Sequence, residues 1–271
     1  AYDTALQYYD KVRKIQESVL GENHLSMATT YDNIGTVYYN KGDFDKALEY
    51  NNKALIIRKD RLGEEHADVA LSYNNIGGVY DKKGDYDTAL QCYDKARKIE
   101  EDVLGENHPS LATTYNNIGT VYNEKGDHDT ALQYYDKTRK IEEAVLGENH
   151  PSLATTYNNI GLVYDRKGDY DTALQYYDKA RKIFESILGE GHPNMATIYN
   201  NIGSVYDNKG DYDTALQCYD KARKIYEDVL GENHPDLATT YNNIGLVYDK
   251  KGDYTTALEY YDKAMKIQEL V

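Results

Sequence analysis

Apolar and small side chains recur along the chain at spacings of three and four residues, in two kinds of stretch that alternate with turn residues. One example of each is formed by Leu111, Tyr115, Ile118, Gly119 and Tyr122 and then by Ala131, Leu132, Tyr135, Ile141 and Val145. This spacing places the members of a stretch on one face of a helix. Between the stretches, Gly126 suits a helix end and Asp127 suits a helix start, and Gly147 ends the second stretch. The pattern predicts two helices that pack against each other.

The same pattern returns every 42 residues. A glycine in segments such as Tyr157-Asn158-Asn159-Ile160-Gly161 marks the period, and its equivalents are Gly35, Gly77, Gly119, Gly161, Gly203 and Gly245. Two other glycine series keep the spacing, in Leu-Gly-Glu-Asn-His-Pro loops and in Lys-Gly-Asp turns. A fixed period means that each unit packs on its neighbours and that no central core exists. The sequence therefore predicts a tandem array.

We expect one all-α array over residues 1–271. It begins with an unpaired second helix and loop at 1–24, followed by helix pairs at 25–66, 67–108, 109–150, 151–192, 193–234 and 235–271. Stacked antiparallel pairs whose two layers differ in width must curve, so we expect a right-handed superhelical solenoid with a concave wall of first helices. The chain starts at Ala1 within a repeat and without methionine, which suggests a piece of a longer protein.

Nine residues of one repeat resemble the tetratricopeptide repeat signature, with tyrosine in place of the usual first tryptophan. They are Tyr157, Ile160, Gly161, Tyr164, Gly168, Tyr170, Ala173, Tyr177 and Ala180. The 42-residue period and the Leu-Gly-Glu-Asn-His-Pro segments resemble the long-helix variety found in kinesin light chains. This resemblance implies a peptide-binding adaptor whose groove is lined by first helices. Kinesin light chains favour acidic cargo, often through Gly-Lys-Tyr-Lys segments. The equivalent here is Gly-Asp-Tyr-Asp, so we expect a neutral or mixed-charge peptide.

Helical geometry predicts which side chains face that groove. Around Gly161 the packed face is centred on Tyr157, Ile160 and Tyr164, and four other positions lie opposite to it. We call these four positions and their equivalents the candidate groove. Its members include Asn33, Asn75, Asn117, Asn159, Asn201 and Asn243, then Thr113, Thr155, Thr197 and Thr239, and the variable residues Lys82, Leu162, Arg166, Leu246 and Lys250. Two of the positions vary between repeats. The equivalents of Leu162 are Thr36, Gly78, Thr120, Ser204 and Leu246, and those of Arg166 are Asn40, Lys82, Glu124, Asn208 and Lys250.

Asparagine both donates and accepts hydrogen bonds, so a row of asparagines can bind the backbone of an extended peptide. A competing interpretation is structural. The chain has 30 tyrosines at fixed repeat positions, where their rings pack between helices. Buried tyrosine hydroxyls need partners, and neighbouring asparagines can supply them, which would remove those asparagines from a ligand.

Charge narrows the class of partner. The chain has 31 Lys and Arg against 46 Asp and Glu, a formal net charge of -15, which is opposite to the charge expected for nucleic-acid or anionic-membrane binding. No apolar run is long enough to predict a membrane span. Cys92 and Cys218 lie three periods apart, so they cannot pair within one chain, and a reducing compartment fits. We expect a cytoplasmic protein whose partners are proteins, neither nucleic acids nor membranes.

Six histidines share the period: His24, His66, His108, His150, His192 and His234. Equivalent loops should lie about 10 Å apart, whereas zinc needs imidazole nitrogens within about 2 Å. We therefore favour a structural role over a metal site. The sequence contains no nucleophile elbow, P-loop or dinucleotide fingerprint, so we expect neither an enzyme nor a cofactor. We interpret the pair Glu142-Glu143 as solvated on an outer helix surface.

The repeat at 25–66 is the least regular. Asn51 and Asn52 replace Tyr-Asp, and a basic segment runs from Arg58 to Arg61. Two interpretations of this segment stay open, namely ion pairing with the acidic residues 100–102 of the next second helix, or a docking patch for an acidic partner.

Three functional hypotheses follow. The favoured one is a scaffold that holds an extended peptide in the candidate groove. The second is a regular array whose repetition serves stability without a dedicated ligand. The third is self-association through an apolar tip at Ile267, Leu270 and Val271. Because the chain starts and ends on second helices, head-to-tail stacking would bring two second helices into contact, so we favour a monomer over an end-to-end oligomer.

Overall fold

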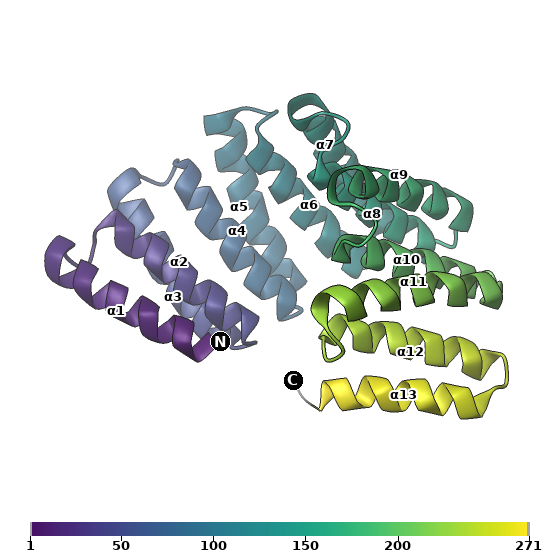
Figure 1. The fold of residues 1–271 in the computed structure, drawn as a ribbon. Coiled ribbons are helices and arrows are strands. Elements are labelled where there is room, and N and C mark those ends of the chain that lie inside the picture. The colour runs from purple at the N-terminus through teal and green to yellow at the C-terminus, as the bar shows by residue number, and fades with distance from the viewer. Residues whose placement is uncertain (1, 270–271) are drawn as a thin grey trace. The chain divides into compact units, whose positions relative to one another are not determined.

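A computed structural model describes residues 2–269, which form thirteen α-helices and no strand (Figure 1). The helices are α1 (Tyr2–Leu20), α2 (Leu25–Asn40), α3 (Phe44–Leu62), α4 (Ala67–Lys82), α5 (Tyr86–Leu104), α6 (Pro109–Glu124), α7 (His128–Leu146), α8 (Pro151–Arg166), α9 (Tyr170–Leu188), α10 (Pro193–Asn208), α11 (Tyr212–Leu230), α12 (Pro235–Lys250) and α13 (Tyr254–Gln268). The all-α repeat fold predicted from the sequence is confirmed. The even-numbered helices are the first helices of the pairs and the odd-numbered ones are the second helices. Leu270 and Val271 of the expected apolar tip lie outside the described residues.

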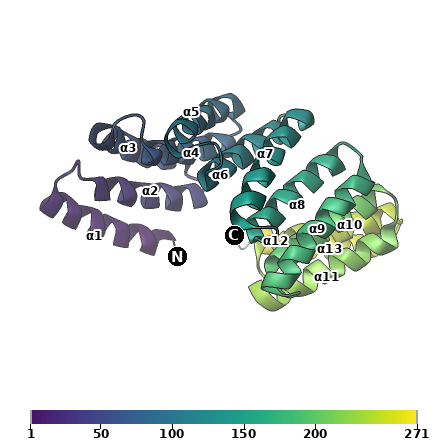
Figure 2. The same cartoon turned by 90° about the horizontal axis from the view of Figure 1, so that it is seen from above.

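The chain divides into two compact units, residues 1–141 and 142–271, and the boundary lies inside α7. In the first unit α2 packs along α3 and α4 packs along α5, while α1 lies against α2 (Figures 1 and 2). In the second unit the pairs are α8 with α9, α10 with α11 and α12 with α13. Each second helix also contacts the next first helix where both belong to one unit, as α3 does with α4. This is the nearest-neighbour packing of a repeat protein.

Glycine and aspartate set the turn inside each pair. Gly126 has φ 81°, a left-handed conformation that L side chains rarely adopt, and its N–H donates to the carbonyl of Asn123. The N–H of Asp127 then donates to the carbonyl of Tyr122 at 2.9 Å. The Asp127 carboxylate accepts from the backbone N–H of Thr130 at 3.2 Å and caps α7. The chain therefore reverses within three residues.

The loop between pairs ends on the periodic histidine. In all six cases Nδ1 accepts a hydrogen bond from the backbone N–H two residues later, as in His150 with Ser152 at 3.2 Å. Each histidine is thus the N-cap of a first helix, and at α6, α8, α10 and α12 a proline follows in the first turn. The structural role predicted for these histidines is therefore to cap the first helices.

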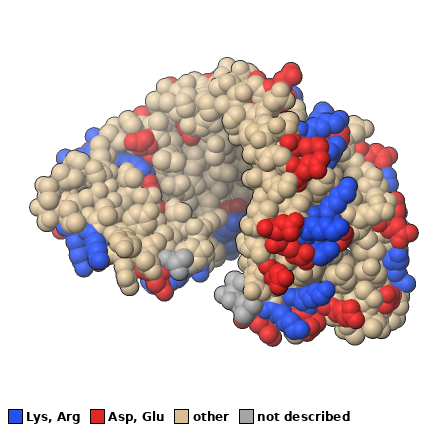
Figure 3. Space-filling model, in the orientation of Figure 1, with Lys and Arg blue, Asp and Glu red and all other residues tan. Residues whose placement is uncertain are grey.

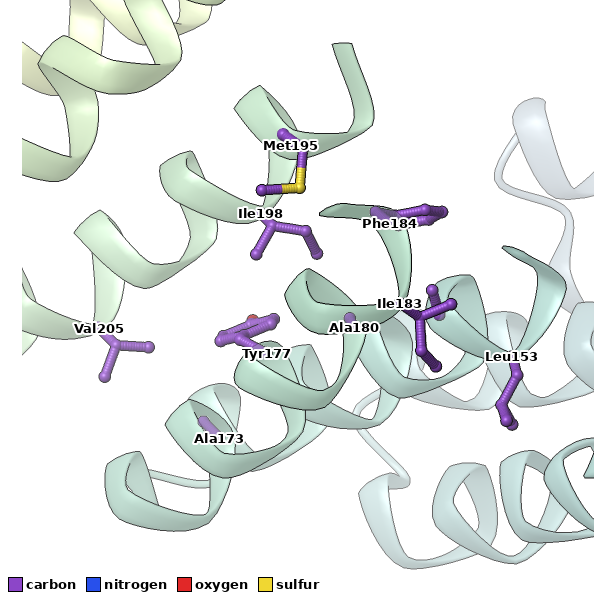
Figure 4. Close-up of a cluster of buried hydrophobic side chains, with 10 residues drawn as sticks. Leu153, Ala173, Tyr177, Ala180, Ile183, Phe184, Met195, Ile198 and Val205 are labelled. Atoms are coloured by element: carbon purple, nitrogen blue, oxygen red, sulfur yellow. The ribbon is translucent and has the colours of Figure 1, made fainter. Parts of the chain in front are cut away.

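The periodic glycine lets a ring of the paired helix approach closely. A Cβ at Gly161 would lie 2.7 Å from Cε1 of Tyr177, and the ring of Tyr177 is fully buried. Figure 4 shows Tyr177 on α9 together with Ala173 and Ala180, in a core that Phe184 shares with residues of α10. Small residues on one helix therefore face large rings on its partner, as the apolar pattern predicts.

Two sequence interpretations are wrong. Glu142 is not on a solvated surface, because it is 7% exposed and accepts a hydrogen bond from Thr156 Oγ1 at 2.7 Å. Arg58 is also buried, at 6% exposed, where it pairs with Asp32 and donates to Ser72 Oγ at 2.6 Å. Its partners come from α2 and α4 and not from the acidic segment at 100–102. Each of these side chains also has a partner in the next repeat, which is Thr156 for Glu142 and Ser72 for Arg58. The sequence of a single repeat gives no sign of such a partner.

Candidate functional site

Every side chain of the candidate groove is exposed or half-buried. The exposed ones are Asn33, Lys82, Thr113, Thr155, Arg166, Thr197, Thr239, Leu246 and Lys250, and the half-buried ones are Asn75, Asn117, Asn159, Leu162, Asn201 and Asn243. Their neighbours on the same helices, such as Ile160 and Gly161, are buried. The packed side of each first helix thus lies opposite its accessible side.

A hollow of about 310 Å³ opens on this side between α10, α11 and α12. It brings together five side chains of the candidate groove, Thr197, Asn201, Ser204, Thr239 and Asn243. The other lining residues are Asn200, Tyr226 and Asp236. A lining of amides, hydroxyls and one carboxylate offers both hydrogen-bond donors and acceptors, which suits a peptide backbone.

Two smaller hollows lie between other pairs of first helices. One, of about 130 Å³, is lined by Thr155 and Thr197 with Asn158, Phe184, Asn194 and Ile198. The other, of about 220 Å³ in the first unit, includes Thr36, Asn75 and Gly78 of the candidate groove. None of these three hollows includes Asn33, Lys82, Thr113, Asn117, Asn159, Leu162, Arg166, Leu246 or Lys250.

The asparagines already make bonds between repeats. Nδ2 of Asn201 donates to Oδ1 of Asn158 in the preceding repeat at 2.7 Å. The preceding residue, Asn200, donates through Nδ2 to Thr240 Oγ1 at 2.8 Å, and its own Oδ1 is buried without a partner. An amide group offers two N–H donors and one carbonyl oxygen, so one such bond does not exhaust Asn201. The asparagines therefore link repeats and also line the hollow between α10 and α12.

Tyr226 is a site residue that the sequence reasoning missed. It reaches the hollow from the second helix α11, it is 3% exposed, and its hydroxyl lies 3.0 Å from Thr197 Oγ1. Burial raises the pKa of Tyr226, so the hydroxyl stays protonated. The signal that could have found it is its position, since the equivalent residues are Arg58, Glu100, Glu142 and Phe184. A position that varies so widely between near-identical repeats distinguishes one repeat from another.

Opposite charges lie close together on this face. Nζ of Lys250 contacts Oδ2 of Asp207 at 2.8 Å, so this lysine does not offer an unopposed positive charge. Burial raises the pKa of Asp81. The positive charge of Lys82 lowers this pKa, and the negative charge of Glu124 raises it. Figure 3 shows Lys and Arg next to Asp and Glu over the second unit. On the second helix α9, Arg181 likewise pairs with Asp178 and Glu185. The charge pattern is mixed.

The described residues contain no group of three or more His, Cys, Asp or Glu side chains that could hold a metal ion. Within residues 2–269, no helix has the length and apolar character needed to cross a bilayer. Cys92 and Cys218 are free thiols, and burial raises the pKa of both.

A family model described as "Tetratricopeptide repeat" matches the chain in six overlapping segments, residues 1–60, 26–99, 68–141, 110–186, 153–207 and 194–269. The matches together extend over nearly the whole sequence. A comparison with curated proteins finds no match.

Solved structures share the fold at low sequence identity. The apo form of RapI has a TM-score of 0.72 and 20% identity, covering 99% of this chain and 92% of that one. BtubC (BKLC) from P. vanneervenii has a TM-score of 0.65 and 24% identity, covering 84% of this chain and 89% of that one. A putative kinesin light chain of Podosopora anserina, with nearly identical TPR-like repeats, has a TM-score of 0.62 and 19% identity, covering 76% of this chain and 97% of that one.

Proposed function

Because this chain belongs to the tetratricopeptide repeat family, we propose that it is a non-enzymatic protein-interaction scaffold that binds an extended peptide segment along its first helices. The observation that carries the proposal is the hollow between α10, α11 and α12. There, side chains from successive repeats offer amide and hydroxyl groups to one ligand. Repetition of such positions at a constant spacing suits an extended chain better than a compact small molecule.

The charges favour a neutral or mixed-charge segment. Lys250 lies against Asp207, and Arg166 has a carboxylate neighbour in Asp165, whose pKa burial raises and Arg166 lowers. A strongly acidic peptide would meet these carboxylates, and a strongly basic one would meet Lys82, Arg166 and Lys250. Electrostatic complementarity mainly selects among partners, so this pattern disfavours both extremes.

The test is a selection from a library of random peptides with the whole chain as bait. Asn201→Ala combined with Asn243→Ala should weaken the binding of selected peptides by about tenfold or more, because peptide groups lose two bidentate partners. The matched control replaces two exposed loop asparagines, Asn149→Ala with Asn233→Ala, and should leave binding unchanged. Equal affinity in the wild type and the groove variant would refute the assignment of this face.

A second candidate is an array that serves stability alone. A repeated set of ion pairs between neighbouring repeats favours it, since Lys209 contacts Asp171 at 2.7 Å and Lys251 contacts Asp213 at 2.6 Å. Failure to select any peptide, with a cooperative unfolding transition retained, would support this alternative.

We also propose that the protein is a monomer and that it is cytoplasmic. In the cytoplasm the free thiols Cys92 and Cys218 would stay reduced. Light scattering over a range of concentrations tests the monomer, because end-to-end association would raise the mass with concentration.

A further inference from the structure

One hollow of the first unit exists where a tyrosine is missing. At Gly77, Gly119, Gly161, Gly203 and Gly245 the ring of a tyrosine on the following helix covers the glycine. At Gly35 the corresponding residue is Asn51, whose Oδ1 lies directly against the glycine. An amide is much smaller than a phenol ring, so the space that a ring fills in the other repeats stays open here.

This space is a hollow of about 220 Å³ between α2, α3 and α4. Its lining comprises Gly35, Thr36, Tyr39, Asn51, Asn74, Asn75, Gly78 and Val79. Gly78 widens it, because the equivalent positions in other repeats carry Thr, Leu or Ser. The volume is below the roughly 300 to 1,000 Å³ of small-molecule pockets and well above the about 30 Å³ that one water occupies. The hollow has the size for one amino-acid side chain.

The lining also has unmet hydrogen-bonding capacity. Oδ1 of Asn51 and Oδ1 of Asn74 are both buried without a partner, and Asn51 is 4% exposed. The orientation of Asn74 is fixed, because its Nδ2 donates to Thr114 Oγ1 at 2.8 Å and to Glu100 Oε1 at 3.4 Å. Turning this amide over would place its oxygen against the Glu100 carboxylate. Both oxygens belong to residues that line the hollow, and neither accepts a hydrogen bond.

No Lys, Arg, Asp or Glu is among the described residues that line the hollow. A charged side chain would lose its hydration here without gaining a counter-ion. An aliphatic side chain would leave both carbonyl oxygens unpaired. A group that donates two hydrogen bonds without carrying charge fits this lining.

We propose that the hollow is a pocket for one carboxamide side chain, Asn or Gln, of a bound peptide, and this inference rests on the proposed peptide-binding function. The NH₂ group of that side chain donates to Asn51 Oδ1 and Asn74 Oδ1. Its carbonyl oxygen faces Asn75, whose amide already bonds to the Asp32 carboxylate and has a second N–H to donate. The least regular repeat thereby becomes the one that selects a particular residue of the peptide.

The experiment selects random peptides on the whole chain and on two variants that fill the hollow with residues of the array itself. Asn51→Tyr restores the ring that covers the glycine elsewhere, and Gly78→Leu introduces the residue found at Leu162 and Leu246. Peptides selected on the wild type should share Asn or Gln at one position, and replacing it by Leu should weaken binding by about tenfold. Both variants should lose this preference while their thermal midpoints stay equal to or above that of the wild type.

The matched control is Asn52→Asp, which restores the array's residue one position away. Asn52 is exposed and donates to the Leu48 carbonyl of its own helix at 2.8 Å, so this change should leave the preference intact. Selection of peptides without an Asn or Gln preference, or the same preference in Asn51→Tyr, would overturn the pocket and leave peptide binding standing. If the chain selects no peptide at all, the pocket and the proposed function both fall.

Discussion

Gly203 leaves room for a ring of the paired helix, and this lets the two helices approach closely. A Cβ at Gly203 would lie 2.7 Å from Cε1 of Tyr219, which is closer than real Cβ contacts. Gly203→Ala gains up to about 1 kcal/mol of helix propensity, but overpacking at a buried contact costs about 1 to 3 kcal/mol. We therefore expect a net loss in the free energy of unfolding, measured by urea denaturation. Gly191→Ala is the control, because nothing lies within 4 Å of a Cβ there, and a Gly203 variant as stable as this control would contradict the packing argument.

Glu142 makes the stability depend on pH. Burial raises its pKa, and this effect outweighs the hydrogen bond from Thr156, which lowers it. A raised folded-state pKa stabilises the fold below the unfolded-state pKa, and this contribution is lost as the pH rises through the folded-state value. The ionised carboxylate thus opposes folding at neutral pH.

We expect Glu142→Gln to raise the thermal midpoint at pH 7, because the amide still accepts from Thr156 without a buried charge. The gain over the wild type should shrink as the pH falls through the raised folded-state pKa of Glu142. It should be lost below about 4, where the carboxyl is protonated in both states. Glu148→Gln, at an exposed loop residue, should show no such gain. A gain for Glu142→Gln that is constant from pH 3 to pH 7 would argue against an electrostatic cause.

The sequence predicts the position of a residue on its own helix, but it does not predict contacts between repeats. The packed glycines and the accessible asparagines follow from counting along one helix, because both depend on the helical period alone. The burial of Glu142 depends on Thr156 in the next repeat, and a pair of glutamates in a sequence gives no sign of it. The sequence does hold one sign that Glu142 and Thr156 are in contact, because both positions change together. One repeat later, the equivalent residues are Phe184 and Ile198.

Helix ends are the elements that the sequence predicts best. Each is set by residues within one turn, namely the aspartate N-cap, the glycine with positive φ and the histidine with its proline. The hollows are harder to predict, because each needs three helices to be placed. Tyr226 of α11, for example, reaches a hollow whose other walls are α10 and α12.

The histidine caps give a prediction about helix stability. Nδ1 of His150 accepts the N–H of Ser152, one of the donors that has no partner within α8. His150→Ala should lower the free energy of unfolding by about 1 kcal/mol, whereas His150→Asn should retain most of it, because asparagine is a favoured N-cap. Thermal unfolding of the two variants checks this. An asparagine variant as unstable as the alanine variant would show that the ring packs and does not cap.

At the scale of the whole molecule, near-identical repeats could pack against the wrong neighbour during folding. The buried pair at the interface between repeats is not the same at every interface. Glu100 bonds Thr114 in the first unit, Glu142 bonds Thr156 in the second, and Phe184 and Ile198 share an apolar core (Figure 4). A repeat packed on a wrong neighbour would bury a carboxylate against an isoleucine or a phenylalanine against a hydroxyl. We infer that these pairs fix the order of the array.

Exchanging one pair for another tests this inference. Phe184→Glu buries a carboxylate against Ile198, and we expect it to cost about 3 kcal/mol or more. Adding Ile198→Thr recreates the pair formed by Glu142 and Thr156, so the double variant should recover about 1 to 3 kcal/mol relative to the sum of the single changes. The double-mutant cycle compares the wild type, Phe184→Glu, Ile198→Thr and the double variant. Urea denaturation gives the free energy of unfolding of each. Additive losses would mean that the two positions do not act as a pair. The order of the repeats would then have to come from the few other positions at which they differ, such as Asn51 and Asn52.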